Sequence, residues 1–434
     1  MIETCRQNMD DVSVFHDHES SVRSYCRSFP VLLGRALDST VFDLAGKDYV
    51  DFFAGAGALN YGHNNPRIVD RVMGYLQDGG ILHSLDFHTQ AKKEFIQKFV
   101  EIVLQPRRLK YRMQFTGPTG TNAVEAALKL ARKVTGRTGV VAFTNAFHGV
   151  SLGALAATAS SNKRAASSLP LHYVTRMPYD GFLGPGMNTA DIVEGMYQTL
   201  GSGLEKPAAF ILEVVQGEGG LHAASRAWLG RIGRLAKDLG ALLIVDEVQT
   251  GCGRTGKFFG FEDMDIDPDI ICLSKSLGGI GFPIAMNLIK EQFDQWQPGE
   301  HNGTFRGNNL AFVAGAAALD YWKAGSDFPM TLPLKAAWVN EELHAIAALF
   351  PENTVTVRGK GMLQGLAFTS PQLAHEVSHC GFEEGVIAET CGPRAEVLKI
   401  LPALTIDHAT LKEGFRRLRT GILKSGVRQK VLSA

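Results

Sequence analysis

The stretches ALLIVD (residues 241–246) and IICLSK (residues 270–275) decide the fold of this chain. Each contains a short apolar run, rich in Ile, Val and Leu, of the kind that forms a strand buried on both faces of a parallel sheet. The first stretch ends on Asp246 and the second on Lys275. Open α/β sheets bind ligands at the carboxyl ends of their strands. The two stretches therefore place one acidic and one basic side chain where a ligand site is expected.

Helix and strand patterns alternate around these two stretches, from about residue 92 to residue 290. Residues 121–134 and 227–239 have helical periodicity, whereas residues 139–144 and 208–215 have the composition of strands. Alternation of this kind predicts βαβ units around a parallel sheet. The chain is therefore expected to be an α/β protein.

After about residue 325 the pattern changes to helices mixed with shorter strands, as expected of a smaller α+β domain. We predict three parts: an N-terminal segment over residues 1–65 that joins the small domain, a large ligand-binding domain over residues 66–325, and a small C-terminal domain over residues 326–434. The strands expected in the small domain cover residues 354–357, 362–368 and 397–401.

The composition is that of a globular protein without the charge excess typical of proteins that bind nucleic acids or membranes. Lys and Arg number 44, as do Asp and Glu, so the balanced charge gives no support to nucleic-acid binding or membrane attachment. The sequence has no apolar stretch close to the roughly 18 residues of a membrane span and no signal-like N-terminus. We expect a cytoplasmic protein with reduced thiols, because its cysteines lack CxxC spacing. They are Cys5, Cys26, Cys252, Cys272, Cys380 and Cys391.

A lysine at a buried strand end is unfavourable unless it is paired or used covalently. A Schiff-base lysine facing an aspartate is the arrangement that pyridoxal phosphate requires. The lysine holds the aldehyde of the cofactor, and the aspartate keeps the pyridine nitrogen protonated. We therefore predict that Lys275 carries this cofactor and that Asp246 pairs with its ring.

Three further segments are candidates for the same site. Residues 116–125 (TGPTGTNAVE) are a Gly/Thr-rich turn that opens a helix, which fits either a phosphate site or an ordinary helix cap. Phe147 follows a predicted strand, so its ring either stacks on a flat cofactor or belongs to the core. Residues 213–220 (EVVQGEGG) leave a buried strand with two carboxylates and three glycines, which indicates either close approach to a ligand or a solvated turn.

Two motifs suggest other classes of enzyme. Residues 251–257 (GCGRTGK) match a dinucleotide fingerprint and most of a phosphate-binding loop, but Phe258 stands where Ser or Thr should bind magnesium. His375 and His379 form a literal HExxH, yet no third zinc ligand follows at the expected spacing. An NAD-dependent dehydrogenase and a zinc hydrolase are therefore the alternatives from other classes.

Taken together, the segments from about residue 30 to residue 425 resemble the class III (ω-amino acid) aminotransferases, which have pyridoxal phosphate fold type I. The resemblance lies in residues 246–256 (DEVQTGCGRTG), in Ser274-Lys275 and in Gly303-Thr304. It implies that Lys275 is also the proton shuttle. It further implies that Thr304 reaches the cofactor phosphate of a neighbouring subunit, so that the protein is at least an obligatory homodimer. The sequence leaves open whether it is a dimer or a tetramer. The cofactor-binding residues that it implies are Gly120, Thr121, Phe147, His148, Asp246, Val248, Gln249, Lys275 and Thr304.

Residues 54–63, 115–127, 147–150, 304–309 and 391–393 resemble the members of this class that act on 2,4-diaminobutyrate. This resemblance implies reversible formation of L-2,4-diaminobutyrate and 2-oxoglutarate from aspartate 4-semialdehyde and L-glutamate. That reaction is the first step toward ectoine, and it also feeds some siderophores and peptide antibiotics. The alternative within the class is another ω-aminotransferase, for 4-aminobutyrate, ornithine or acetylornithine.

Two positions depart from the pattern of the 4-aminobutyrate and ornithine enzymes. Val150 stands where they commonly have an Arg that clamps a substrate carboxylate, and Lys399 stands where an Arg pairs with the residue matching Glu218. Lys cannot grip a carboxylate in the bidentate way of Arg. We predict that Glu218, Lys399 and Arg306 contact the substrate, in a pocket with fewer fixed cations. Which residue holds the substrate's α-carboxylate is left open by the sequence.

Overall fold

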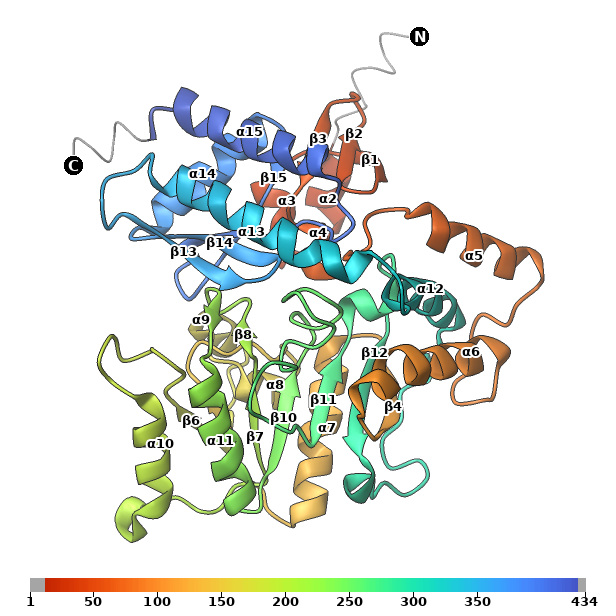
Figure 1. Ribbon diagram of the computed structural model, residues 1–434, viewed down its shortest axis with the longest axis vertical. Helices are drawn as coiled ribbons and strands as arrows, with labels where there is room; N and C mark the ends of the chain where they lie inside the picture. The colour runs from red at the N-terminus through yellow and green to blue at the C-terminus, as the bar shows by residue number, and fades with distance from the viewer. Residues whose placement is uncertain (1–11, 428–434) are drawn as a thin grey trace.

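The computed structural model describes residues 12–427, and its centre is a seven-stranded sheet (Figure 1). Six of these strands run in one direction, and β12 runs against both of its neighbours. A mostly parallel sheet flanked by helices confirms the predicted α/β class. In spatial order the strands are β4 (Tyr111–Gly117), β12 (Ala285–Lys290), β11 (Ile270–Leu273), β10 (Leu242–Asp246), β7 (Ala209–Leu212), β5 (Val140–Phe143) and β6 (Val174–Met177).

Helices cover both faces of this sheet, which explains why its strands are apolar on both sides. On one face, α7 (Gly120–Thr135) packs into a cluster that contains Leu242 and Ile244. On the other, α11 (Arg226–Asp238) contributes Trp228 to the core that contains Leu243 and Val245. Successive strand residues point to opposite faces, so β10 is buried on both. The other helices of this part are α5 (Pro66–Gln77), α6 (Gln90–Lys98), α8 (Leu152–Ala157), α9 (Ser161–Ala165), α10 (Thr189–Gln198) and α12 (Asn309–Leu319).

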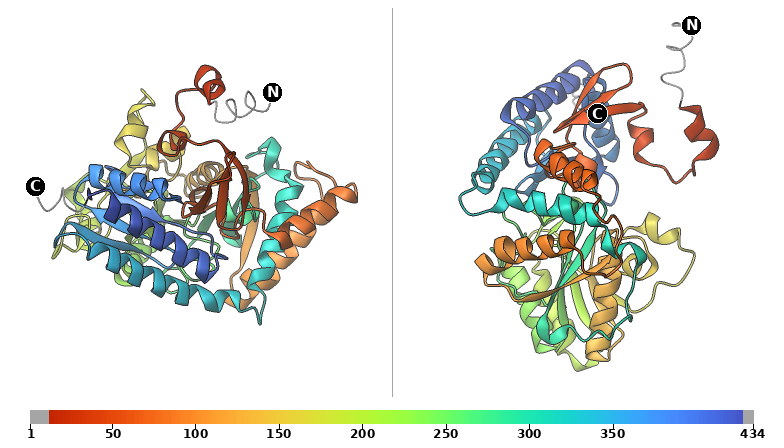
Figure 2. Two further views of the ribbon diagram at one scale, coloured as in Figure 1. Left: turned by 90° about the horizontal axis from the view of Figure 1, so that it is seen from above. Right: turned by 90° about the vertical axis from the view of Figure 1, so that its right-hand side faces the viewer.

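Described N-terminal and C-terminal segments lie together above the large sheet, where two four-stranded sheets form a smaller part (Figures 1 and 2). The first sheet joins N-terminal strands to the C-terminal half, because β3 pairs in parallel with β15. Its order is β1 (Leu33–Leu37), β2 (Thr40–Asp43), β3 (Asp48–Asp51) and β15 (Val386–Ile387). The second has the order β13 (Val355–Lys360), β14 (Leu363–Phe368), β17 (Val397–Ile400) and β16 (Thr390–Cys391).

Helices complete the smaller part. The long helices are α13 (Phe328–Ala347), α14 (Pro371–Glu383) and α15 (His408–Lys424), and α15 buries Phe415 and Leu418. Three short helices near the N-terminus are α2 (Ser13–His18), α3 (Tyr25–Ser28) and α4 (Ala54–Gly57). In the described residues no helix is both long and apolar enough to cross a bilayer. The prediction of reduced thiols extends to Cys5, which lies outside the described residues.

The strand order brings distant segments of sequence to one edge of the large sheet. The strands β4, β5, β7, β10 and β11 all point toward the smaller part, so the residues that follow them gather beneath it (Figure 1). Asp246 ends β10 directly beside Cys272 of β11. Lys275 follows three residues after Cys272, in a 3₁₀ turn over Lys275–Gly278. The predicted acidic and basic strand ends are therefore neighbours.

Candidate active site

Lys275 stands at the carboxyl end of β11 in a conformation that non-glycine residues rarely adopt. Its φ is 49°, and its Nζ donates a hydrogen bond to the backbone oxygen of Ala56, at 2.8 Å. Burial lowers the pKa of Lys275, although Glu218 opposes this shift. Strained backbone of this kind is maintained mainly at functional sites. The lowered pKa favours the neutral amine that a nucleophile or a base requires.

Asp246 is held from two sides at the end of β10. Its Oδ2 accepts a hydrogen bond from His148 Nδ1 at 2.7 Å, and its Oδ1 accepts one from the backbone N–H of Val248 at 3.1 Å. The imidazole of His148 has no exposed surface, and Asp246 is 5% exposed. The structure therefore brings His148 to the site through Asp246. A carboxylate fixed in this way suits a permanent negative charge beside a pyridine nitrogen.

The start of α7 packs against the segment after β5. The Thr119 side chain and Asn122 form a capping box, and Thr121 Oγ1 lies 2.5 Å from Ser151 Oγ. A Cβ at Gly149 would overlap the Thr121 side chain, and a Cβ at Gly120 would overlap Val248. These close approaches bring Gly120, Thr121 and Val248 into one region. The start of α7 also presents backbone N–H groups, and a phosphate binds favourably at such a helix start.

Gln249 links this region to Glu218. Its Nε2 donates to the backbone oxygen of Ala56 at 3.1 Å and to Glu218 Oε1 at 3.2 Å. Its Oε1 is buried and has no hydrogen-bond partner in the described chain. A buried acceptor without a donor is rare in folded proteins. The 3-hydroxyl of pyridoxal phosphate is a donor that fits it, so these residues satisfy the chemistry of that cofactor.

A cavity of about 500 Å³ opens beside these groups. Its wall includes Phe147, whose backbone N–H donates to Glu213 Oε2 at 3.0 Å, and the carboxylate of Glu218. Two exposed cations, Lys163 and Arg394, also line it, and Lys163 Nζ lies 5.5 Å from the centre of the Phe147 ring. Sequence reasoning missed both cations, because neither stands in a motif.

Glu218 pairs with Lys399, whose side chain is fully buried, and a third charged residue, Glu389, also contacts Lys399. Lys399 Nζ lies 2.7 Å from Glu218 Oε1 and 2.6 Å from Glu389 Oε1. Burial alone would raise the pKa of Glu218, but Lys399 and Lys275 outweigh it and lower that pKa to about 2. Sequence reasoning also missed Glu389. The available signal was a single acidic residue within the apolar run of residues 386–391.

Thr304 and Arg306 lie apart from these contacts within one chain. The backbone oxygen of Thr304 accepts a hydrogen bond from His83 Nε2 at 2.8 Å. The guanidinium of Arg306 pairs with Asp86 at 2.6 Å. Arg306 is therefore engaged by an acidic side chain of its own subunit, and it does not line the 500 Å³ cavity.

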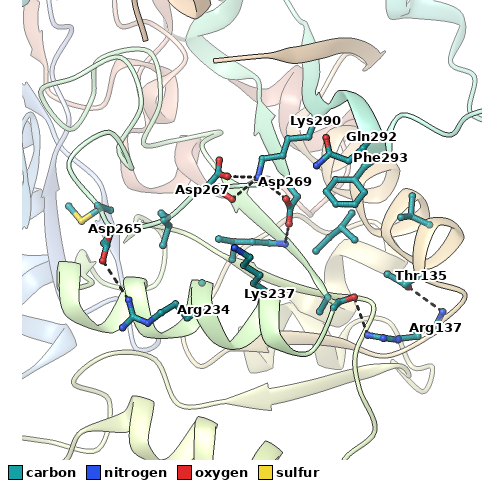
Figure 3. A pocket seen from close by; sticks show the side chains of 18 residues that line it. Thr135, Arg137, Arg234, Lys237, Asp265, Asp267, Asp269, Lys290, Gln292 and Phe293 are labelled. Carbon is teal, nitrogen blue, oxygen red and sulfur yellow. Dashed lines mark hydrogen bonds and ion pairs between the residues drawn. The ribbon is translucent and has the colours of Figure 1, made fainter. Parts of the chain in front are cut away.

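A larger cavity, of about 800 Å³, lies at the opposite edge of the large sheet (Figure 3). It opens at the amino ends of β10 and β11, away from Lys275 and Asp246. Its charges pair with one another, since Lys290 contacts Asp267 at 2.7 Å and Asp269 at 2.9 Å. Because ligands of open α/β sheets bind at the carboxyl ends, we place the active site beside Lys275 despite the smaller cavity there.

The two motifs that suggested other enzymes have different roles in the structure. Residues 251–264 form successive turns, so no helix follows the glycine-rich stretch as dinucleotide binding requires. Within that stretch Arg254 is fully buried and donates to the backbone oxygens of Met362 at 3.1 Å and Pro402 at 2.6 Å. His379 lies on α14 and faces Glu383 at 3.5 Å. In residues 12–427 no group of three or more His, Cys, Asp or Glu side chains could hold a metal ion.

The fold, with Lys275 and Asp246 at neighbouring strand ends, is that of the aminotransferases of fold type I. A family model described as "Aminotransferase class-III" matches residues 22–422. The chain belongs to this family, which confirms the predicted family and fold.

Close relatives cover nearly the whole chain. A protein of Halalkalibacterium halodurans named diaminobutyrate–2-oxoglutarate transaminase is 50% identical over 412 residues, which are 95% of this chain and 96% of that protein. Proteins with the same name from Sporosarcina pasteurii and Vibrio cholerae are 49% and 48% identical and cover 97% and 95% of this chain. These alignments span 97% and 100% of the two relatives.

Solved structures share the fold at much lower identity. An S-selective transaminase from Bacillus megaterium has a TM-score of 0.85 and 21% identity, and covers 97% of this chain and 99% of its own. The ornithine aminotransferase of Toxoplasma gondii has a TM-score of 0.83 and 22% identity, and covers 98% of both chains. These two likenesses concern the fold alone.

Proposed function

We propose that the protein is a pyridoxal phosphate enzyme that reversibly forms L-2,4-diaminobutyrate and 2-oxoglutarate from aspartate 4-semialdehyde and L-glutamate. The observation that carries this proposal is the 48–50% identity, over at least 95% of the chain, to three proteins named for that reaction. The step serves the start of an ectoine pathway or of a related route that uses diaminobutyrate.

The residues at the strand ends account for the chemistry. Pyridoxal phosphate, when bound, supplies an aldehyde that accepts the amino group and a ring that withdraws electrons from the reacting carbon. Lys275 would hold the aldehyde and, through its Nζ, would move the proton at the reacting carbon of the substrate. Its lowered pKa suits this role, because a neutral amine can accept a proton.

The other site residues are proposed to position the cofactor and to polarise its ring. Asp246 would hold the proton on the pyridine nitrogen, and His148 fixes the Asp246 carboxylate by the 2.7 Å hydrogen bond. The start of α7, with Gly120 and Thr121, would hold the phosphate. In addition, Gln249 would accept a hydrogen bond from the 3-hydroxyl, and Val248 and Phe147 would pack against the ring.

The substrate enters through the 500 Å³ cavity, whose wall suits a diamino acid. When the γ-amine of diaminobutyrate reaches Lys275, its α-carbon carries both an ammonium and a carboxylate. Glu218 accepts the ammonium, and the cations Lys163 and Arg394 are available to the carboxylate. Val150 is 58% exposed and supplies no cation, so a substrate with only a carboxylate gains less from this wall.

We also propose that the enzyme is a homodimer in which Thr304 contacts the partner's cofactor. Exposed apolar side chains surround Thr304, as expected of a surface that another chain covers. The ring of Phe305 stands 5.4 Å from that of His83, and the exposed neighbours are Ile81 at 58%, Leu82 at 51%, Phe87 at 70% and Phe305 at 64%. Arg306 would contact the substrate only in such an assembly.

A cytoplasmic location agrees with the thiols, since five described cysteines are free and four of them are buried. For the domains we propose an N-terminal segment over residues 1–65, a large domain over residues 66–325 that binds the cofactor, and a small domain over residues 326–434. The large sheet supports this division, because its strands run from Tyr111 to Lys290.

The substrate is tested by kcat/KM for diaminobutyrate, 4-aminobutyrate and ornithine, with 2-oxoglutarate as acceptor. We expect diaminobutyrate to be preferred by at least about tenfold, or about 1.4 kcal/mol of differential transition-state binding. A ranking with 4-aminobutyrate or ornithine first would overturn the substrate and favour another ω-aminotransferase, while the family would stand.

A further inference from the structure

Three charged side chains from separate segments meet behind the substrate cavity. Glu218 lies between β8 (Val215–Gln216) and β9 (His222–Ala223), Glu389 lies between β15 and β16, and Lys399 lies on β17. Lys399 Nζ contacts both carboxylates, at 2.7 Å and 2.6 Å. The backbone N–H of Lys399 also donates to the backbone oxygen of Glu389 at 2.8 Å, which fixes the two residues relative to each other.

In this cluster one ammonium faces two carboxyl groups. Burial disfavours the ammonium of Lys399, but Glu218 and Glu389 outweigh burial and raise the pKa of Lys399 well above its usual value. Lys399 is therefore charged, and its single positive charge is shared by two carboxylates. Burial raises the pKa of Glu389, although Lys399 opposes that shift.

The arrangement determines which charge a substrate meets. Glu218 lines the 500 Å³ cavity, and its side chain is 26% exposed. The side chains of Lys399 and Glu389 are 0% and 5% exposed and do not line that cavity. The inner wall thus presents a carboxylate, with its counter-cation held behind it.

We propose that Glu389 is a specificity-determining positioning residue, which holds Lys399 behind Glu218 so that the cavity wall keeps a negative charge for a second ammonium on the amino donor. The proposal rests on the proposed function and adds a residue to it. With Glu389 in place, Lys399 keeps a partner when Glu218 turns to a substrate ammonium. Without it, that movement would leave a buried cation unpaired, which is strongly unfavourable.

The test is Glu389→Gln, which keeps the size of the side chain and removes its charge. Lys399 then neutralises Glu218, so we expect KM for diaminobutyrate to rise by about tenfold while kcat changes by less than about twofold. KM for 4-aminobutyrate, which brings no second ammonium, should not rise. Glu389→Asp should restore much of the preference. Glu383→Gln, an exposed site on α14, is the matched control and should leave both donors unchanged.

A double variant shows whether Glu389 acts through Lys399. Glu389→Gln combined with Lys399→Met leaves Glu218 as the sole charge of the three, so the preference for diaminobutyrate should return toward that of the wild type. The cofactor absorbance spectrum and the Tm verify that each variant is folded and loaded. The proposal is overturned if Glu389→Gln retains the preference, or if it lowers kcat equally for all donors. It is also overturned if the double variant stays as unselective as Glu389→Gln.

The same measurements distinguish a failure of the proposed function from a failure of the role of Glu389. A wild-type enzyme that does not prefer diaminobutyrate would overturn the substrate itself. A wild-type enzyme that prefers it, with the preference unaltered in Glu389→Gln, would overturn only the role of Glu389.

Discussion

His148 Nδ1 donates a hydrogen bond to Asp246 Oδ2 at 2.7 Å, and this contact joins the segment after β5 to the end of β10. The two side chains are 0% and 5% exposed, so water does not compete for the bond. Nδ1 is the donor, because an ionised carboxylate can only accept. The carboxylate of Asp246 is thereby fixed in place, as its proposed pairing with a pyridine nitrogen requires.

Asp246→Asn should lower kcat by about a hundredfold or more, while the cofactor still binds. An amide cannot hold a proton on the pyridine nitrogen, and losing one such preorganised electrostatic contact costs on the order of 3 kcal/mol in the transition state. The measurement is kcat at saturating substrate, beside the absorbance of the bound cofactor. Asp238→Asn, at the exposed end of α11, is the control. A kcat equal to that of the wild type would rule out the role of Asp246.

Lys275→Ala should abolish transamination and remove the cofactor attachment that borohydride reduces. The reason is that Lys275 alone, of the lysines in the described chain, directly follows β11 at the proposed cofactor site. The measurement is the mass of the intact protein after reduction. Lys257→Ala, in the glycine-rich stretch, should keep the reduced adduct. Detection of that adduct on another lysine of the Lys275→Ala protein would disprove the assignment.

Subunit mixing checks whether Thr304 acts across a dimer. A mixed dimer of Lys275→Ala and Thr304→Ala chains has one site with both lesions and one site with neither, if Thr304 serves its partner. Activity should then recover toward about half of that of the wild type per mixed dimer. Each variant mixed with itself gives the baseline. Mixtures that stay as inactive as their parents would mean that Thr304 serves its own subunit.

Glu247 predicts a pH dependence of stability. Burial raises the pKa of this carboxyl from 4.5 to about 7, so the folded state holds a proton that the unfolded state releases above its own pKa. Stability from this group is fully present below about pH 4.5 and is lost as pH rises to about 7. Between pH 5.5 and pH 8.5 the wild type should lose on the order of 2 kcal/mol relative to Glu247→Gln.

The measurement is the Tm of both proteins at the two pH values. Gln keeps an acceptor for the backbone N–H of Phe261, which now donates to Glu247 Oε1 at 3.1 Å. Glu341→Gln, exposed on α13, should follow the wild type. If the Tm difference between wild type and Glu247→Gln does not change with pH, Glu247 is ionised in the folded state throughout.

Sequence predicted the elements of the large sheet better than it predicted their ends. The apolar runs before Asp246 and Lys275 form β10 and β11, because an uninterrupted run of branched apolar residues suits a strand covered on both faces. The strand expected over residues 208–215 ends at Leu212. Glu213 follows, and its carboxylate accepts the backbone N–H groups of Phe147 and Gly217. Local composition contains no information about such a contact.

In the candidate site, too, sequence predicted local placement but not contacts between distant segments. Residues within one motif could be assigned from sequence, because strand ends and a helix start position them locally. The contact of His148 with Asp246 and the position of Glu389 beside Lys399 depend on which strands are neighbours. The order β11-β10-β7-β5 and the pairing of β14, β17 and β16 supply that information.

Arg254 connects the glycine-rich stretch to the smaller part of the molecule. Its guanidinium joins Asn60 to the backbone oxygens of Met362 and Pro402, and thus clamps the loop after β10 to both halves of the smaller part. Burial lowers the pKa of Arg254 to about 9, yet breaking these contacts would still strand a cation in the core at neutral pH. These contacts therefore oppose rotation of the smaller part away from the large sheet at this point. If substrates use the cavity beside Phe147, their exchange should need movement of side chains and loops rather than of whole domains.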